Sequence, residues 1–254
     1  MKFNWKNEVI LCVIAVFMVT NSSRAQSKQD AKDWPTIATF SIIAYDEKTG
    51  ELGGAVQSRV FAVGNGVLWA EAGTGIVATQ AMVDVSYGPR ALAMLRDGKT
   101  PEDVVKKVWD SDPNPLPNSW PKSGRQFAVM NIKGEHAVYT GPKTSEWSGH
   151  KAATHVIAQG NILAGQEVVD EMVKAYQETE GHMSLRLVAA LEAGQKAGGD
   201  IRGMQSAAML IVKKKAGPWL NNDTVVRLHV DDNKEPIKEL RRLVVKAQQY
   251  YRFK

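Results

Sequence analysis

Residues 37–60, IATFSIIAYDEKTGELGGAVQSRV, carry the strongest fold signal in the chain. Residues 37–45 are apolar and rich in β-branched side chains, which favours a strand. Residues 46–50 supply turn formers, and residues 52–60 return as a second strand. The stretch therefore predicts a single β-hairpin.

Alternation along the first strand divides its side chains between two faces. Thr39 and Ser41 share one face, and Phe40, Ile42 and Ala44 share the other. Ser58 and Arg59 end the returning strand, where antiparallel pairing brings them close to the start of the first. Two readings follow: a functional site built from hydroxyls and one cation, or strand hydroxyls that merely face solvent.

The remainder of the chain predicts runs of strands and runs of helices. We expect further strands at residues 67–72, 75–80, 125–131, 135–140, 154–161, 204–212 and 224–230. We expect helices at residues 86–98, 166–179, 184–197 and 236–250, and a further helix that begins after Thr100 as its N-cap. This further helix should end where a surface loop at residues 110–124 begins. Residues 141–151 are expected to form a polar loop. Grouped elements without strict βαβ alternation predict an α+β fold with antiparallel sheets.

Composition is typical of a globular protein and excludes few functions. The 254 residues are 44% hydrophobic and 23% charged, with a net charge of +5. The basic residues gather near the two ends, without the aromatic interleaving of a nucleic-acid-binding stripe, so no nucleic-acid partner is expected. No sequence motif for a metal or a cofactor is present, and none is predicted.

The first residues have the pattern of a secretory signal peptide. Lys2 and Lys6 precede an apolar run at residues 9–19, and the small residues Ser23 and Ala25 end the polar segment that follows. A run of this length is too short for a membrane-spanning helix, which needs about 20 residues. We expect cleavage near Ala25 and export to the periplasm or the medium, with no stable membrane anchor afterwards.

Cleavage there would also remove the single cysteine of the chain, because Cys12 lies within the apolar run. A mature chain without cysteine can form no disulfide and offers no thiolate for catalysis or metal binding. The expected organisation is therefore a signal peptide at 1–25, a polar leader at 26–36 and one domain at 37–254.

Three polar clusters could take part in chemistry, and in the third, at residues 86–90, Arg90 could meet an anionic group but is expected to lie on the surface. Glycine and carboxamides meet at Gln159-Gly160-Asn161, where an amide could stabilise an oxyanion; the alternative is a plain strand-to-helix turn. Asp200, Arg202 and Gln205 lie just outside an apolar run, and the first two could equally form an exposed ion pair of little consequence.

Four stretches in this order resemble the domain of unknown function 1028 family. They are TFSIIAYDEKTGELGGAVQS (39–58), GIVATQAMVDVSYGPRALAML (75–95), AQGNILAG (158–165) and GGDIRGMQSAAMLIV (198–212). The resemblance implies membership of the N-terminal-nucleophile (Ntn) hydrolase-like superfamily. It also implies a four-layer αββα sandwich, two antiparallel sheets covered by helix pairs.

The resemblance implies a mechanism class in which the first residue of the first strand is the nucleophile and its own α-amine the general base. The matching residue is Thr39, which follows Ala38, so an active Thr39 requires a cut between these two residues. Asn161 would then supply an oxyanion donor, and Ser58 and Arg59 would position the substrate. Further substrate-binding candidates are Ser41, Gln80, Asp200, Arg202 and Gln205.

Three hypotheses follow for the function. The first is an exported amidohydrolase that cleaves a C–N amide bond of a small or peptide-like substrate. The second is a non-catalytic ligand-binding or assembly protein on the same scaffold, and the third is an enzyme that uses Ser41, Asp200 or a metal instead. Self-association into a homo-oligomer stays open, because no single apolar face stands out in the sequence.

Overall fold

The computed structural model describes residues 39–144 and 147–251. The signal peptide, the polar leader and the Ala38–Thr39 bond predicted above lie outside these residues. The described residues form the elements β1 (Thr39–Asp46), β2 (Glu51–Ser58), β3 (Leu68–Glu71), β4 (Gly75–Ala81), α2 (Tyr87–Arg96), α3 (Pro101–Asp110), β5 (Arg125–Asn131), β6 (His136–Thr140), β7 (Trp147–Ala153), β8 (Val156–Leu163), α4 (Glu167–Glu178), α5 (Met183–Lys196), β9 (Ser206–Val212), β10 (Thr224–Val230) and α6 (Pro236–Tyr251).

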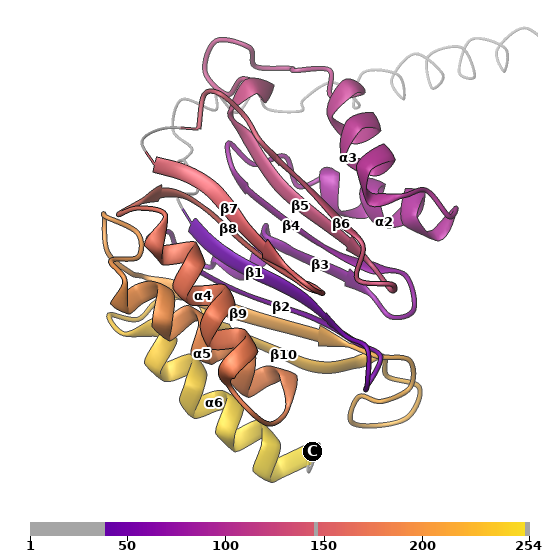
Figure 1. Cartoon of the computed structure of the whole chain (residues 1–254), viewed down its shortest axis with the longest axis vertical. Helices are drawn as coiled ribbons and strands as arrows, with labels where there is room; N and C mark the ends of the chain where they lie inside the picture. Colours follow the sequence, from indigo (N-terminus) through magenta and orange to yellow (C-terminus); the bar gives the residue numbers. More distant parts are fainter. Residues whose placement is uncertain (1–38, 145–146, 252–254) are drawn as a thin grey trace, which may run out of the picture. The chain divides into compact units, whose positions relative to one another are not determined.

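The strands form two antiparallel sheets, as predicted (Figure 1). One sheet has six strands in the order β10-β9-β2-β1-β8-β7, and the other has four in the order β3-β4-β5-β6. The β1–β2 hairpin lies at the centre of the larger sheet, with Thr39 directly opposite Ser58. The hairpin prediction and its register at the open end are confirmed.

Side-chain alternation along β1 separates two hydrophobic layers. Phe40, Ile42 and Ala44 pack in a cluster that includes apolar residues of α4, α5 and α6. Ile43 packs between the sheets in a second cluster, with Ile76 of β4 among its members. The face of β1 that carries Thr39 and Ser41 is therefore the face turned toward the smaller sheet.

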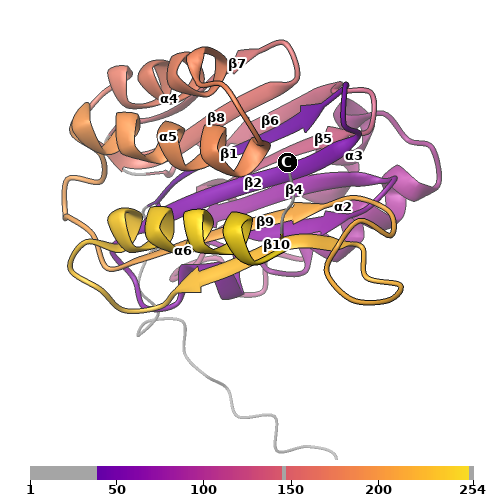
Figure 2. The same ribbon diagram turned by 90° about the horizontal axis from the view of Figure 1, so that it is seen from below.

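Helices cover the outer face of each sheet, but in unequal number. Apolar residues of α2 and α3 pack against β4 and β5 of the smaller sheet. Three helices, α4, α5 and α6, cover the larger sheet, whereas a pair was predicted (Figure 2). The additional helix is needed because β9 and β10 widen this sheet beyond the area that α4 and α5 cover.

Small residues on β2 let one of these helices approach closely. A Cβ added at Gly53 would lie 2.4 Å from the Met183 Sδ at the start of α5. The glycines of the hairpin thus mark close packing, as the sequence indicated. The predicted Thr100 N-cap of α3 is also confirmed, since its side chain accepts a hydrogen bond from the Asp103 N–H.

Two sequence-based assignments were wrong. Residues 147–151, expected within a polar loop, belong to the edge strand β7 (Trp147–Ala153), which pairs with β8 along its length. Pairing with a buried neighbour outweighs the low strand propensity of this segment, WSGHKAA. The loop at 110–124, expected at the surface, buries Asp112 and Trp120.

The burial of Asp112 has a specific electrostatic reason. The Tyr87 hydroxyl donates to Asp112 Oδ2 at 2.6 Å, and Arg125 Nε donates to the same oxygen at 3.2 Å. Arg125 also donates from Nη1 to the Met82 carbonyl oxygen at 2.7 Å. This group ties α2 and the loop to the first residue of β5, directly before Gln126.

The same contacts change the acidity of both partners. Burial alone would raise the pKa of the Asp112 carboxyl, but hydrogen bonds from Tyr87 and the Asn114 backbone, together with the Arg125 charge, hold it below its usual range. Burial and the bond to Asp112 raise the pKa of the Tyr87 hydroxyl. The carboxylate is therefore the stable form of Asp112 in the folded protein.

No helix within residues 39–144 and 147–251 is long and apolar enough to cross a membrane.

Replacing Asp112 with Asn should lower the free energy of unfolding by about 3 kcal/mol at pH 7, because it leaves the buried Arg125 charge without its partner. A carboxyl whose pKa is depressed by folding stabilises the protein above its unfolded pKa of about 3.9, and this contribution is lost as the pH falls further. The deficit of Asp112→Asn should therefore shrink below about pH 3.9. Urea unfolding at pH 7 and pH 3 measures both effects.

Asp110→Asn is the matched control, because the Asp110 carboxylate is exposed and pairs only with Lys106 among the described residues. It should change the stability by less than about 0.5 kcal/mol at pH 7. An Asp112→Asn protein as stable as the control would show that the buried ion pair does not hold this loop.

Candidate functional site

A row of small polar side chains crosses the inner face of the larger sheet at the end where β1 begins. Each of five neighbouring strands contributes one residue, and each residue lies directly opposite the next. In the order β7, β8, β1, β2, β9 these residues are Ser148, Asn161, Thr39, Ser58 and Ser206. Residues that pair directly in neighbouring antiparallel strands point to the same face. We call these five residues the polar row.

Thr39 occupies the middle of the polar row and is 0% exposed. Its Oγ1 donates a hydrogen bond to Ser58 Oγ at 3.1 Å. Ser41 is likewise 0% exposed, so the reading in which these hydroxyls face solvent is wrong. Both hydroxyls point into the space between the sheets, where the smaller sheet covers them.

Carboxamides from both sheets fill the space beside the polar row. We call Ser41, Gln80, Gln126, Gln159 and Asn161 the amide network. Ser41 Oγ donates to Gln80 Oε1 at 2.6 Å, and Gln80 Nε2 donates to Gln126 Oε1 at 2.8 Å and to the Thr39 carbonyl oxygen at 3.2 Å. Asn161 Nδ2 donates to the same Gln126 oxygen at 3.1 Å.

Gln126 joins the two sheets through its amide nitrogen. Gln126 Nε2, on β5 of the smaller sheet, lies 2.8 Å from the Gly160 carbonyl oxygen on β8 of the larger one. It also lies 3.1 Å from Thr140 Oγ1 on β6. The five members of the network are at most 1% exposed, so each bond forms away from water.

The amide network leaves some capacity for hydrogen bonding unused. The side-chain oxygens of Gln159 and Asn161 are buried and accept no hydrogen bond from the described residues. Among the described residues, only one of the two amide hydrogens of Asn161 forms a hydrogen bond, the one to Gln126. The remaining N–H of Asn161, on the residue opposite Thr39, is chemically suited to stabilise a developing oxyanion.

Two arginines, Arg59 and Arg202, lie at the same end of the larger sheet, each with a side-chain partner. Arg59 Nη1 donates to Gln205 Oε1 at 3.1 Å, and the Gln205 backbone N–H donates to the Ser58 carbonyl oxygen at 2.9 Å. Arg59 is exposed beside the end of the polar row. Its guanidinium could therefore bind an anionic group that reaches this rim.

The pair between Asp200 and Arg202 differs from the exposed ion pair considered above. Arg202 donates from Nε and Nη2 to the two oxygens of Asp200, at 3.1 and 2.9 Å. The Asp200 carboxylate is 0% exposed, whereas 32% of the Arg202 side chain is exposed. Asp200 also forms an isolated bridge with Leu163, which brings the pair to the end of β8.

The structure thus places all the candidates at one end of the larger sheet: Thr39, Ser41, Ser58, Gln80 and Asn161 lie between the sheets, and Arg59, Asp200, Arg202 and Gln205 lie at the strand ends. Sequence analysis missed Gln126, whose side chain bonds to Gln80, to Asn161 and to the Gly160 carbonyl oxygen of the larger sheet. The sequence contained a sign of this role. Residues 126, 128 and 130 share the inner face of β5, and Gln126 is polar whereas Ala128 and Met130 are apolar.

A metal centre finds no support in the side-chain geometry. Within the described part of the chain, no group of three or more His, Cys, Asp or Glu residues is arranged to hold a metal ion.

Comparison with known proteins agrees with the resemblance seen in the sequence. The family of unknown function DUF1028 matches residues 39–240, and the chain belongs to this family. A crystal structure of protein SPO2555 from Silicibacter pomeroyi, described with the same family, superposes with a TM-score of 0.74. The two chains are 33% identical over 83% of this chain and 86% of the other. No curated protein matches the sequence.

Replacing Gln126 with Met should destabilise the protein by about 3 kcal/mol. The change keeps the side-chain volume but removes the acceptor for one N–H of Gln80 and one of Asn161 and the donor to the Gly160 carbonyl oxygen, and a lost partner costs about 1–3 kcal/mol for a buried group. Thermal and urea unfolding measure the loss. Gln177→Met on the exposed face of α4 is the control and should lie within about 0.5 kcal/mol of the parent protein. Equal stability of both variants would contradict a role of Gln126 in joining the sheets.

Proposed function

We propose that the two facing sheets and their helices are the αββα sandwich of the Ntn hydrolase-like superfamily. The layer order supports this assignment, since α2 and α3 pack outside one sheet and α4, α5 and α6 outside the other. In such a scaffold the first residue of the central strand carries the nucleophile. That position is held by Thr39 at the start of β1.

We further propose that the protein is an exported amidohydrolase that cleaves a C–N amide bond of a small or peptide-like substrate. One observation carries the proposal: the Thr39 hydroxyl is held by Ser58 on one side, and the Asn161 carboxamide stands opposite Thr39 on the other. A nucleophile, an orienting hydroxyl and an amide donor are the groups that acyl transfer needs.

The reaction requires a free amine on Thr39. The α-amine, with an ordinary pKa of about 7.7–8.0, is partly neutral near pH 7 and can accept the hydroxyl proton. Thr39 Oγ1 then attacks the carbonyl carbon, and the Asn161 N–H stabilises the oxyanion. The C–N bond breaks as the leaving nitrogen takes the proton, and water hydrolyses the acyl ester to regenerate Thr39.

The other site residues take supporting roles in this proposal. Arg59 and Arg202 present their charges at the exposed rim, where they would bind polar parts of the substrate. Ser41 donates to Gln80, and Gln80 donates to the Thr39 carbonyl oxygen, so both act as positioning residues rather than direct contacts. Gln205 orients Arg59, and Asp200 orients Arg202.

The mature protein should begin at Thr39. Export after cleavage near Ala25 would leave a blocked nucleophile, and a second cut between Ala38 and Thr39 releases the amine. Intact mass and N-terminal sequencing of the protein recovered from the exported fraction measure the terminus. A mature chain that begins near Gln26 would contradict the Thr39 mechanism and favour the ligand-binding alternative.

Replacing Thr39 with Ala should abolish amide hydrolysis while the fold persists. The test uses protein that begins at residue 39, produced by a specific protease, and a panel of chromogenic acyl amides with acidic, neutral and basic acyl groups. Thr39→Ala removes one buried hydrogen bond, which costs about 1 kcal/mol, so the melting temperature should fall by only a few degrees.

Thr39→Ser keeps the hydroxyl and the amine and is the matched control. It should retain turnover within about tenfold of the parent protein. Hydrolysis by the Thr39→Ala protein at the parent rate would refute the nucleophile.

A further inference from the structure

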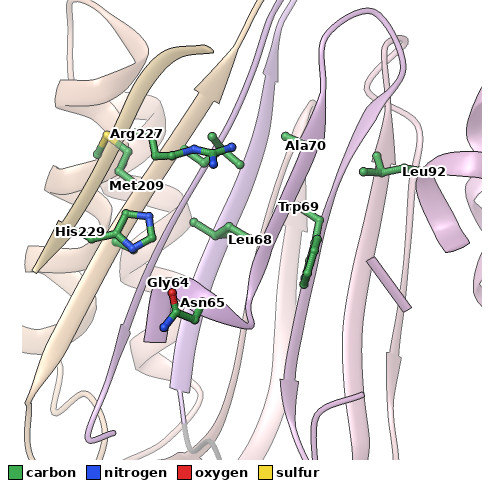
Figure 3. A pocket seen from close by; sticks show the side chains of 11 residues that line it. Gly64, Asn65, Leu68, Trp69, Ala70, Leu92, Met209, Arg227 and His229 are labelled. Carbon is green, nitrogen blue, oxygen red and sulfur yellow. The ribbon is translucent and has the colours of Figure 1, made fainter. Parts of the chain in front are cut away.

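A cleft lies between the edge strand of the smaller sheet and the edge of the larger one (Figure 3). Its volume is about 280 Å³, at the small end of the range for ligand sites. Arg227 and His229 of β10 point across it toward the strand that carries Leu68 and Ala70. We call this space the edge cleft.

One wall of the edge cleft is unusually polar for its place in the sheet. Arg227 pairs with Leu210 and His229 with Ala208, so both share the inner face with apolar residues of β9. Within residues 39–144 and 147–251 the Arg227 guanidinium forms no ion pair or hydrogen bond. The wall therefore holds a cation that is available to a ligand.

The imidazole of His229 forms no hydrogen bond with the carboxylate of Asp231. The His229 Nδ1 lies 3.9 Å from Asp231 Oδ1, beyond hydrogen-bonding distance. A Cβ at Gly64 would lie 2.4 Å from the same nitrogen, so the glycine makes room for the imidazole against the cleft wall. Asn65 adds a neutral amide at this end of the cleft.

The opposite wall is the outer edge of β3, which pairs there with no other strand of the described residues. The Thr79 N–H donates to the Val67 carbonyl oxygen at 2.9 Å, which makes this couple a hydrogen-bonded pair of the β3–β4 ladder. Because such pairs alternate along antiparallel strands, Leu68 and Ala70 turn their N–H and C=O groups away from β4. Both residues line the edge cleft.

We propose that the edge cleft binds a short extended peptide that bears a carboxylate. The peptide backbone adds to β3 through Leu68 and Ala70, as in strand addition to an open sheet edge. Its carboxylate meets Arg227, whose planar guanidinium suits carboxylate oxygens in a two-bond contact. Leu92 and Leu210 provide apolar wall for the neighbouring side chains of the peptide.

This site is separate from the polar row. β10 lies three strands from β1 in the larger sheet, about 14 Å at the usual spacing of about 4.8 Å. The proposal therefore does not depend on catalysis by Thr39. Binding measured in the Thr39→Ala protein tests the cleft alone, whatever the outcome of the hydrolysis assays.

The experiment is calorimetric titration of the Thr39→Ala protein at low salt with N-acetyl-Val-Glu-Val-Glu. We expect binding at least tenfold tighter than for the amidated Val-Gln-Val-Gln peptide of the same length. Arg227→Gln should remove this preference, so that both peptides bind equally within about twofold. Two further versions of the acidic peptide carry N-methyl groups on alternate amides, one version on the odd-numbered and the other on the even-numbered residues. One of the two should no longer bind, because its methyl groups replace the N–H donors that pair with β3.

Arg242→Gln is the matched control, because it removes one exposed arginine on α6, whose apolar side packs on the other face of the larger sheet. It should keep the full preference for the acidic peptide. Three results would each overturn the proposal: no binding of the acidic peptide at millimolar concentration, a preference that survives Arg227→Gln, or undiminished binding of both N-methylated peptides. Under any of them, Arg227 would serve only to keep other strands from the β3 edge.

Discussion

The side chain of Gln126 lies between the two sheets and forms hydrogen bonds with both. Its amide nitrogen meets the Gly160 carbonyl of the larger sheet, and its oxygen accepts from Gln80 and Asn161. Ser41, Gln80 and Gln159 add further hydrogen bonds between the sheets at this end, and apolar side chains fill the inter-sheet layer beyond them. Hydrophobic packing tolerates small sliding movements between sheets, whereas these buried hydrogen bonds fix their relative position at one end.

That position determines the geometry around Thr39. Gln80 donates to the Thr39 carbonyl oxygen, so the smaller sheet holds the backbone of the residue whose hydroxyl meets Ser58. Burying so many amides and hydroxyls stabilises the fold only when each finds a partner, because an unpaired buried polar group is costly. The apolar clusters on both sides of the larger sheet offset this cost. A polar layer of this kind, concentrated at one end of an otherwise apolar core, makes the structure around Thr39 more rigid.

Much of this arrangement could be predicted from local sequence, and the reasons for success and failure are physical. The β1–β2 hairpin follows from alternation and a tight turn, so the placement of Ser58 beside Thr39 needed no tertiary information. β7 was missed because its polar sequence becomes a strand only through pairing with β8. Gln126 and Asp112 were missed for a related reason: their partners lie on distant segments, and a single polar residue in a strand or loop does not reveal which group it will meet.

The unequal width of the two sheets explains why the inter-sheet space ends differently at its two sides. At the β3 edge the larger sheet continues through β9 to β10, and the inner residues change from Ala208 and Leu210 to His229 and Arg227. If this side were simply closed packing, the sequence TVVRLHV of β10 would carry apolar residues at both inner positions, as β9 does. A cation and an imidazole there keep the space hydrated in the absence of a ligand, because charged groups are not buried without partners. The same two side chains that prevent the sheets from closing over the β3 edge also give that edge a preference for negative charge. In this cleft the same charged side chain has two effects. It protects the open edge of β3 from unselective pairing with other strands, and it makes that edge selective for an acidic peptide.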